Sequence, residues 1–158
     1  MTKVKNVYCD DCGHKGYAVA KEMYPALTDK DGNTVVEYES LVAYCPKCRK
    51  ILYIDEIAKE NSKRRNDVIR EKFDLVSFKD ILKLPRRYAV PRELMTKILD
   101  LNASVWRGAA PASDESDRIK MALADPKYFI EQLDKAKDVM PKAKYEKVRK
   151  RATRMTDH

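Results

Sequence analysis

The residues with the clearest chemistry are four cysteines, which form two Cys-x-x-Cys pairs separated by 32 residues. The ligand candidates are Cys9, Cys12, Cys45 and Cys48. Zinc favours four thiolates in a tetrahedron, and a structural zinc site leaves no position open for water. The spacing therefore predicts one structural Zn²⁺ that joins two turns of the chain.

Disulfide bonds and an iron site are the alternative uses of these cysteines. Disulfides are rare in a reducing cytosol, and the first residues, MTKVKNV, have no apolar run of signal-peptide length, so we expect a cytoplasmic protein. Iron takes the same four thiolates, and the spacing alone does not exclude it. His14 follows the first pair, but four thiols already complete the shell, so we interpret it as an exposed turn residue.

The turns and strands that would position these ligands are visible in the first third of the sequence. Gly13 suits a turn with positive φ after Cys12, and Pro46 pre-sets a turn within the second pair. Residues 17–28 and 34–43 read as strands, joined by a turn that contains Asp31-Gly32. Residues 51–54 read as a last short strand. This pattern predicts a zinc ribbon of β-hairpins over residues 1–54.

The remainder of the chain predicts helices, so the expected fold class is α+β, with a zinc ribbon followed by an all-α domain. Residues 55–75 form the expected connecting helix. We expect it to be exposed around 61–67, where no apolar stripe exists and where the helix can break. Residues 76–158 hold short helices. These are expected from Ser77 to Leu84, over 92–101, from 113 to 124, after Asp125-Pro126, and after Pro141.

Positive charge is concentrated in this second part. Residues 1–53 hold 8 Lys/Arg and 7 Asp/Glu. Of the chain's 33 basic and 25 acidic residues, 25 basic and 18 acidic residues therefore lie in residues 54–158, which gives this part a net charge of +7. No stretch of about 20 apolar residues is present, so no membrane span is expected. The sequence has two histidines and four glycines and shows no evident nucleophile–base pair or phosphate-binding loop. We therefore expect no catalytic residues and do not expect the protein to be an enzyme.

Three groups of residues are candidates for nucleic-acid contact. Each also has a plain interpretation, as a solvated tail, as solubilising charge or, for the tryptophan, as core. They are the basic C-terminal helix with Lys144, Lys147 and Arg151, the cluster of Arg86, Arg87 and Arg92, and the segment with Asn102, Ser104, Trp106 and Arg107.

Five motifs together resemble bacterial antitoxins that join a zinc ribbon to a helix-turn-helix. They are YCDDCG (residues 8–13), VAYCPKC (42–48), VSFKDIL (76–82), LPRRY (84–88) and SDRIKMALADPKYF (116–129). The chain is similar to the zinc-finger antitoxins of the motility-regulator toxin pair and to the N-terminal region of Panacea-type, phage-associated antitoxins. The resemblance implies a helix-turn-helix-like domain that binds operator DNA, and neutralisation of a cognate toxin.

The resemblance also assigns residues 102–107 to the recognition helix, which is several residues shorter here than in that family. Six residues give little more than one turn, whereas a helix that lies in a major groove needs about two. The leading hypothesis is a DNA-binding antitoxin or transcriptional regulator that binds duplex DNA and a cognate protein, as a possible homodimer. The alternative is a protein-binding inhibitor or adaptor, possibly phage-encoded, with a degenerate helix-turn-helix and no operator specificity.

Overall fold

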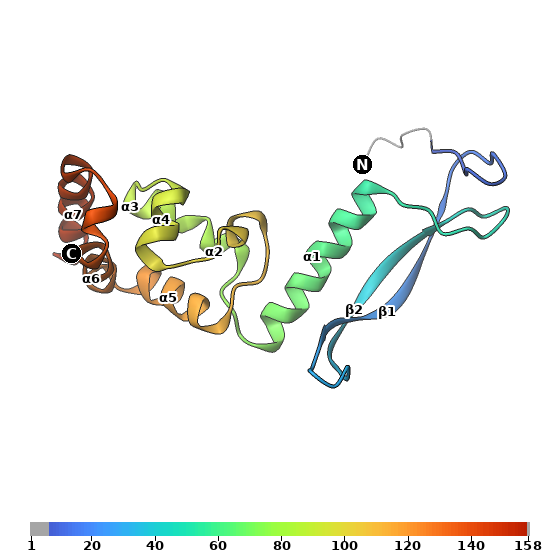
Figure 1. The fold of residues 1–158 in the computed structure, drawn as a ribbon, viewed down its shortest axis with the longest axis horizontal. Coiled ribbons are helices and arrows are strands. Elements are labelled where there is room, and N and C mark those ends of the chain that lie inside the picture. Colours follow the sequence, from blue (N-terminus) through green and yellow to red (C-terminus); the bar gives the residue numbers. More distant parts are fainter. Residues whose placement is uncertain (1–6, 158) are drawn as a thin grey trace. The chain divides into compact units, whose positions relative to one another are not determined.

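A computed structural model describes residues 7–157, which form an antiparallel two-stranded hairpin followed by helices (Figure 1). The fold class is therefore α+β, as predicted. The chain divides into two compact units at Ile69/Arg70, within the segment predicted as a connecting helix. We call them the hairpin unit (residues 7–69) and the helical unit (residues 70–157).

The hairpin consists of β1 (Ala18–Thr28) and β2 (Thr34–Tyr44), within a residue of the predicted strands. Asp29 closes the turn, since its carboxylate accepts hydrogen bonds from the backbone N–H groups of Asp31 and Asn33. Gly32 supplies the positive φ of 82° that this turn requires. The predicted last strand is reduced to a bridge between Tyr44 and Ile51, which adds a short third segment beside β2.

Helix α1 (Asp55–Lys72) runs unbroken through residues 61–67, so the break expected there is absent. Several polar side chains attach it to the hairpin. The Asn61 amide donates to the carbonyl of Leu41 at 2.8 Å and accepts from the Leu41 N–H at 2.7 Å. The Arg64 guanidinium donates to the carbonyl of Glu39 at 3.2 Å. Ser62, Lys63, Arg65 and Asp67 are exposed, as expected for this segment, whereas Asn61 and Arg64 are half-buried because they satisfy backbone groups at the outer edge of β2.

The helical unit begins with two short helices, α2 (Phe78–Ile81) and α3 (Lys83–Tyr88). Ser77 caps α2 by accepting from the Asp80 N–H, as predicted. The expected end of the helix before Pro85 is wrong, because a new helix starts at Lys83 and accommodates Pro85 in its first turn, where a missing N–H costs nothing. Helix α4 (Arg92–Leu99) follows Pro91, and the 3₁₀ helix η1 (Ala103–Arg107) follows α4.

Helices α5 (Ser113–Ala124), α6 (Pro126–Lys135) and α7 (Lys142–Thr156) start where the sequence predicted, and the 3₁₀ helix η2 (Lys137–Val139) joins the last two. Their apolar faces meet those of α3, α4 and η1 in one continuous core. Tyr88 and Phe129 stack at its centre with ring centroids 3.7 Å apart, both fully buried. No helix in the described part of the chain is long and apolar enough to cross a membrane.

Candidate metal centre

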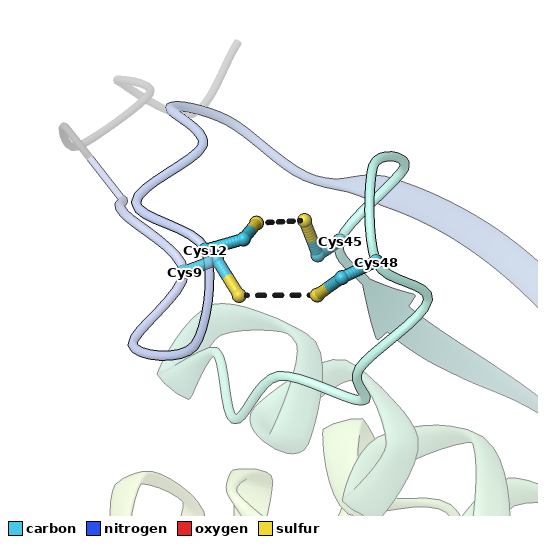
Figure 2. A group of neighbouring side chains, drawn as sticks. All are labelled: Cys9, Cys12, Cys45 and Cys48. Atoms are coloured by element: carbon cyan, nitrogen blue, oxygen red, sulfur yellow. Dashed lines mark hydrogen bonds between the residues drawn. The ribbon is translucent and has the colours of Figure 1, made fainter.

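The four cysteine sulfurs lie together at the end of the hairpin, all within 4.8 Å of one another. Figure 2 shows them facing one another across two loops, with Cys9 opposite Cys48 and Cys12 opposite Cys45. Both of these sulfur–sulfur distances are 3.5 Å. A disulfide would need about 2.05 Å, and all four cysteines are free.

The backbone of the two loops repeats the same hydrogen-bond pattern, which explains why the sulfurs converge. In the first loop, Gly13 N–H donates to the carbonyl of Cys9 at 2.8 Å, and Cys9 N–H donates to the carbonyl of His14 at 2.9 Å. In the second, Arg49 N–H donates to the carbonyl of Cys45 and Cys45 N–H to that of Lys50, both at 2.8 Å.

The residue after each second cysteine adopts a left-handed conformation. Gly13 has a φ of 70°, as its sequence position predicted, but Arg49 has a φ of 68° and is not glycine. A non-glycine residue there costs roughly 1–2 kcal/mol. Arg49 adopts this conformation despite the cost. Its cationic side chain thereby stands one residue from the thiol of Cys48.

The donor set fits a tetrahedral metal ion. Four sulfurs at about 2.3 Å from a common centre lie about 3.8 Å apart, close to the distances seen here. Cys9 and Cys45 are buried, whereas Cys48 is exposed. With four protein ligands the shell is closed, so the site is suited to holding two loops together and has no vacant position for a substrate.

Backbone N–H groups prepare one of these thiols for ionisation. The N–H of Cys48, with that of Lys47, points at the Cys45 sulfur and lowers the pKa of that thiol to about 7. The Lys50 N–H acts in the same sense on Cys48, but the Cys9 thiol and burial outweigh it and raise the pKa of Cys48 to about 12. Four thiolates this close therefore require a cation, and a metal that binds here displaces protons.

Charge around the loops offsets that of a tetrathiolate. Lys50 bridges the two loops through an ion pair with Asp11 at 3.0 Å, and Asp11 raises the pKa of the Lys50 ammonium. Lys15, Lys47 and Arg49 are exposed beside the ligands. His14 is half-buried and contributes backbone groups to the loop, and it is not a member of the sulfur cluster.

Two of the three groups considered for nucleic-acid contact meet in the helical unit. The Arg151 guanidinium donates to the carbonyls of Arg87 at 3.1 Å and Arg86 at 3.4 Å, which joins α7 to α3. Lys144, Lys147 and Arg151 line one groove with Lys150 and Arg154, which were outside the predicted set. Arg92 lies exposed at the start of α4 and does not line this groove.

The third group lies in and just before η1, and most of its side chains make contacts within the fold. Trp106 is 8% exposed, and its indole N–H donates to the Thr96 hydroxyl at 2.7 Å. Asn102 caps η1 by accepting from the Ser104 N–H, and Ser104 is half-buried. Arg107 is exposed. A buried tryptophan cannot reach a base edge without unpacking, so the plain interpretation of Trp106 as a core residue describes its position.

Comparison of the sequence with protein-family models, with curated proteins and with solved structures finds no match. The resemblance to zinc-ribbon antitoxins therefore stays a hypothesis, carried by the five motifs alone. The structure adds two observations to these motifs, namely the clustered cysteines and the basic groove.

Proposed function

We propose that this protein is a non-enzymatic DNA-binding antitoxin or transcriptional regulator. In this proposal a structural Zn²⁺ bound by the four cysteines holds the hairpin unit, which binds a cognate protein. The helical unit binds duplex DNA, and the chain acts in the reducing cytoplasm, where its thiols stay available to the metal. Pairing of two copies would match a palindromic operator.

One observation carries the DNA half of the proposal, namely the distribution of charge between the two units. Of the 25 Lys/Arg and 18 Asp/Glu in residues 54–158, 4 of each lie in residues 54–69. Residues 70–158 therefore hold 21 Lys/Arg and 14 Asp/Glu, which is a net charge of +7 out of the chain's +8. A surplus of this size in a unit of under a hundred residues favours contact with a polyanion. Affinity of this kind comes from phosphates and falls steeply with salt.

A titration of the full, zinc-loaded chain against a labelled duplex of mixed sequence tests this half. If about four phosphates are contacted, the affinity should fall on the order of 100-fold between 50 and 200 mM salt. Selection of binding sequences from a random duplex library then asks whether an operator exists. Absence of duplex binding even at 50 mM salt would refute the DNA half.

A second function, a protein-binding inhibitor or adaptor, is favoured by apolar side chains exposed on the hairpin unit. Tyr53, Ile51 and Met23 are 80%, 69% and 60% exposed. The short η1 also offers little of a recognition helix. A single stoichiometric partner that survives nuclease treatment, and that is lost with the double variant Ile51→Ser/Tyr53→Ser, would support this function over operator binding.

A further inference from the structure

The strongest unassigned feature is a groove between the end of α3 and one face of α7, with a volume of about 350 Å³. Tyr88, Ala89 and Val148 form its apolar part, and the remaining side chains around it are all cationic: Lys144, Lys147, Lys150, Arg151 and Arg154. Glu146, the sole acid in α7, does not line the groove. Five positive charges without a lining acid form a site for an extended anion.

The walls of the groove are held in place by the core of the helical unit. Tyr88 stacks on Phe129, and its hydroxyl donates to the carbonyl of Ala122. From α7, Val148 and Ala152 are buried in the same core. Arg151 bridges from α7 to the α3 carbonyls. The cations therefore project from a rigid surface, so little ordering entropy is lost when a ligand binds.

The charges that face the groove are available, in contrast to that of their neighbour Arg149. Arg149 donates to the Asp134 carboxylate at 3.1 Å and thereby helps join α7 to α6. Within residues 7–157, no acidic side chain pairs with Lys144, Lys147, Lys150 or Arg154. Arg149 and Arg151 thus take part in contacts between helices, whereas Lys144, Lys147, Lys150 and Arg154 keep their charges available for a ligand.

The spacing of the cations matches a nucleic-acid backbone. Lys144 and Arg154 are ten residues apart on one helix, which corresponds to about 15 Å along its axis. Phosphates of one DNA strand recur every 3.4 Å along the duplex axis, so a row of cations parallel to that axis spans the rise of about four of them. Single strands are usually gripped by stacking bases on exposed aromatic rings, but the groove's one ring, that of Tyr88, is fully buried.

We propose that the groove between α3 and α7 binds the phosphate backbone of duplex DNA, with α7 parallel to the duplex axis. This inference rests on the proposed function and names the surface that performs it. It moves the DNA contact away from η1, where the resemblance would place it, to a face that reads phosphates and not base edges. Binding through this groove is accordingly indifferent to sequence, so the choice of an operator would require further contacts elsewhere in the protein.

The test uses the full, zinc-loaded chain, a labelled mixed-sequence duplex of about 20 base pairs, and a salt series. Lys147→Glu/Lys150→Glu reverses two exposed charges of the groove that have no structural partner. Loss of two phosphate contacts should make the slope of log K against log salt shallower by about 1.8 and lower affinity at 0.1 M salt on the order of 50-fold. Circular dichroism should show an unchanged melting curve.

Lys72→Glu/Lys97→Glu is the matched control, because it makes the same change in net charge at two exposed helical positions outside the groove. It should bind within about threefold of the natural protein, and Arg107→Glu in η1 should do the same. The inference is overturned if Arg107→Glu abolishes binding while the groove variant binds normally. It is also overturned if a single strand, or polyglutamate of equal charge, binds more tightly than the duplex.

Failure of the proposed function gives a different result, since the natural protein would then show no duplex binding at any salt concentration. A natural protein that binds the duplex, together with a groove variant that does not, supports both. A natural protein and a groove variant that bind equally well retain the DNA-binding function and refute this surface alone.

Discussion

The two units of this protein are stabilised in different ways. Among residues 7–69 the buried apolar side chains are Ala26, Ala43, Ile54 and the two cysteines Cys9 and Cys45, so two of the five are candidate metal ligands. The helical unit buries a continuous core that runs from Val76 to Ala152 and includes large rings at its centre. A hairpin with so small a core needs another source of stability, and a metal ion bound by the four clustered cysteines would supply it.

The two units are also suited to different kinds of binding. The hairpin unit has little core and exposes large apolar residues, which suits contact with a protein. The helical unit has its own core and uses the outer face of α7 for charge. Experiments that perturb one unit and observe the other therefore test this comparison.

Removal of the metal should have the largest effect. Structural zinc contributes roughly 10–16 kcal/mol to small metal-dependent folds. Chelation, or Cys45→Ser, should abolish hydrogen-exchange protection over β1 and β2. Trp106, the chain's one tryptophan, lies in the helical core and should keep its emission and its denaturation midpoint.

His14→Ala is the control for this experiment, because His14 lies in the first loop without belonging to the sulfur cluster. It should retain the metal and the protected strands. Persistence of strand protection after chelation would show that the hairpin is stable without metal, and a simultaneous shift in Trp106 emission would show that the two units unfold as one.

A core substitution should produce the reverse pattern. Phe129→Ala removes a fully buried ring that stacks on Tyr88, and a loss of about 3–5 kcal/mol is expected in denaturation followed by Trp106 fluorescence. Metal content should stay at its normal value. Phe73→Ala, at a residue that is 43% exposed, should cost far less. A metal content that falls with Phe129→Ala would contradict the independence of the units.

The attachment of α1 to the hairpin provides a smaller test within the first unit. Asn61→Ala leaves both backbone groups of Leu41 without their partners, at a cost of about 1–3 kcal/mol. The variant should exchange the Leu41 amide hydrogen faster and bind the metal more weakly, by on the order of tenfold or more. The exposed neighbour Ser62 provides the control, as Ser62→Ala should change neither quantity.

The smallest effect concerns the contact between α6 and α7. Burial acts to raise the pKa of the Asp134 carboxyl, but hydrogen bonds from Tyr145 at 2.6 Å and from Arg149 outweigh it, so the pKa is lowered. A lowered folded-state pKa adds stability above the ordinary value of 3.8, and this stability is lost as the pH falls through the folded value.

Asp134→Asn should therefore destabilise the helical unit at neutral pH by less than about 1 kcal/mol, because the pair is partly exposed. The difference between the two proteins should shrink as the pH falls below about 4. Denaturation curves at pH 7 and pH 3, followed by Trp106 emission, measure it. A difference that stays constant over this range would show that the charge of Asp134 is not responsible.

Local rules predicted much of the fold. The Asp31-Gly32 turn, the Ser77 and Asp125 caps, and the prolines at 126 and 141 act within a few residues, and each marked an element correctly. The clustering of four sulfurs also followed from spacing, since two equal loops at one end of a hairpin face each other. The identity of the metal and the DNA-binding role stay proposals.

The rest depended on contacts that are distant in sequence. The contacts of Asn61 and Arg64 could not be predicted, because no pattern in α1 reveals that their partners are strand carbonyls some twenty residues earlier. The groove needed α3 and α7 to meet, about sixty residues apart. By its position in the sequence Trp106 could be a core or a surface residue, and its burial follows from packing in a core whose members run from Val76 to Ala152.

The central claim is that four thiolates hold one ion and that this ion maintains the hairpin unit. Elemental analysis of protein purified without added metal, before and after the four cysteines are blocked by a thiol-specific reagent, tests it most directly. One zinc per chain, released in step with loss of hairpin protection, is the expected result. A chain that carries no stoichiometric metal yet keeps its two strands protected would contradict the account.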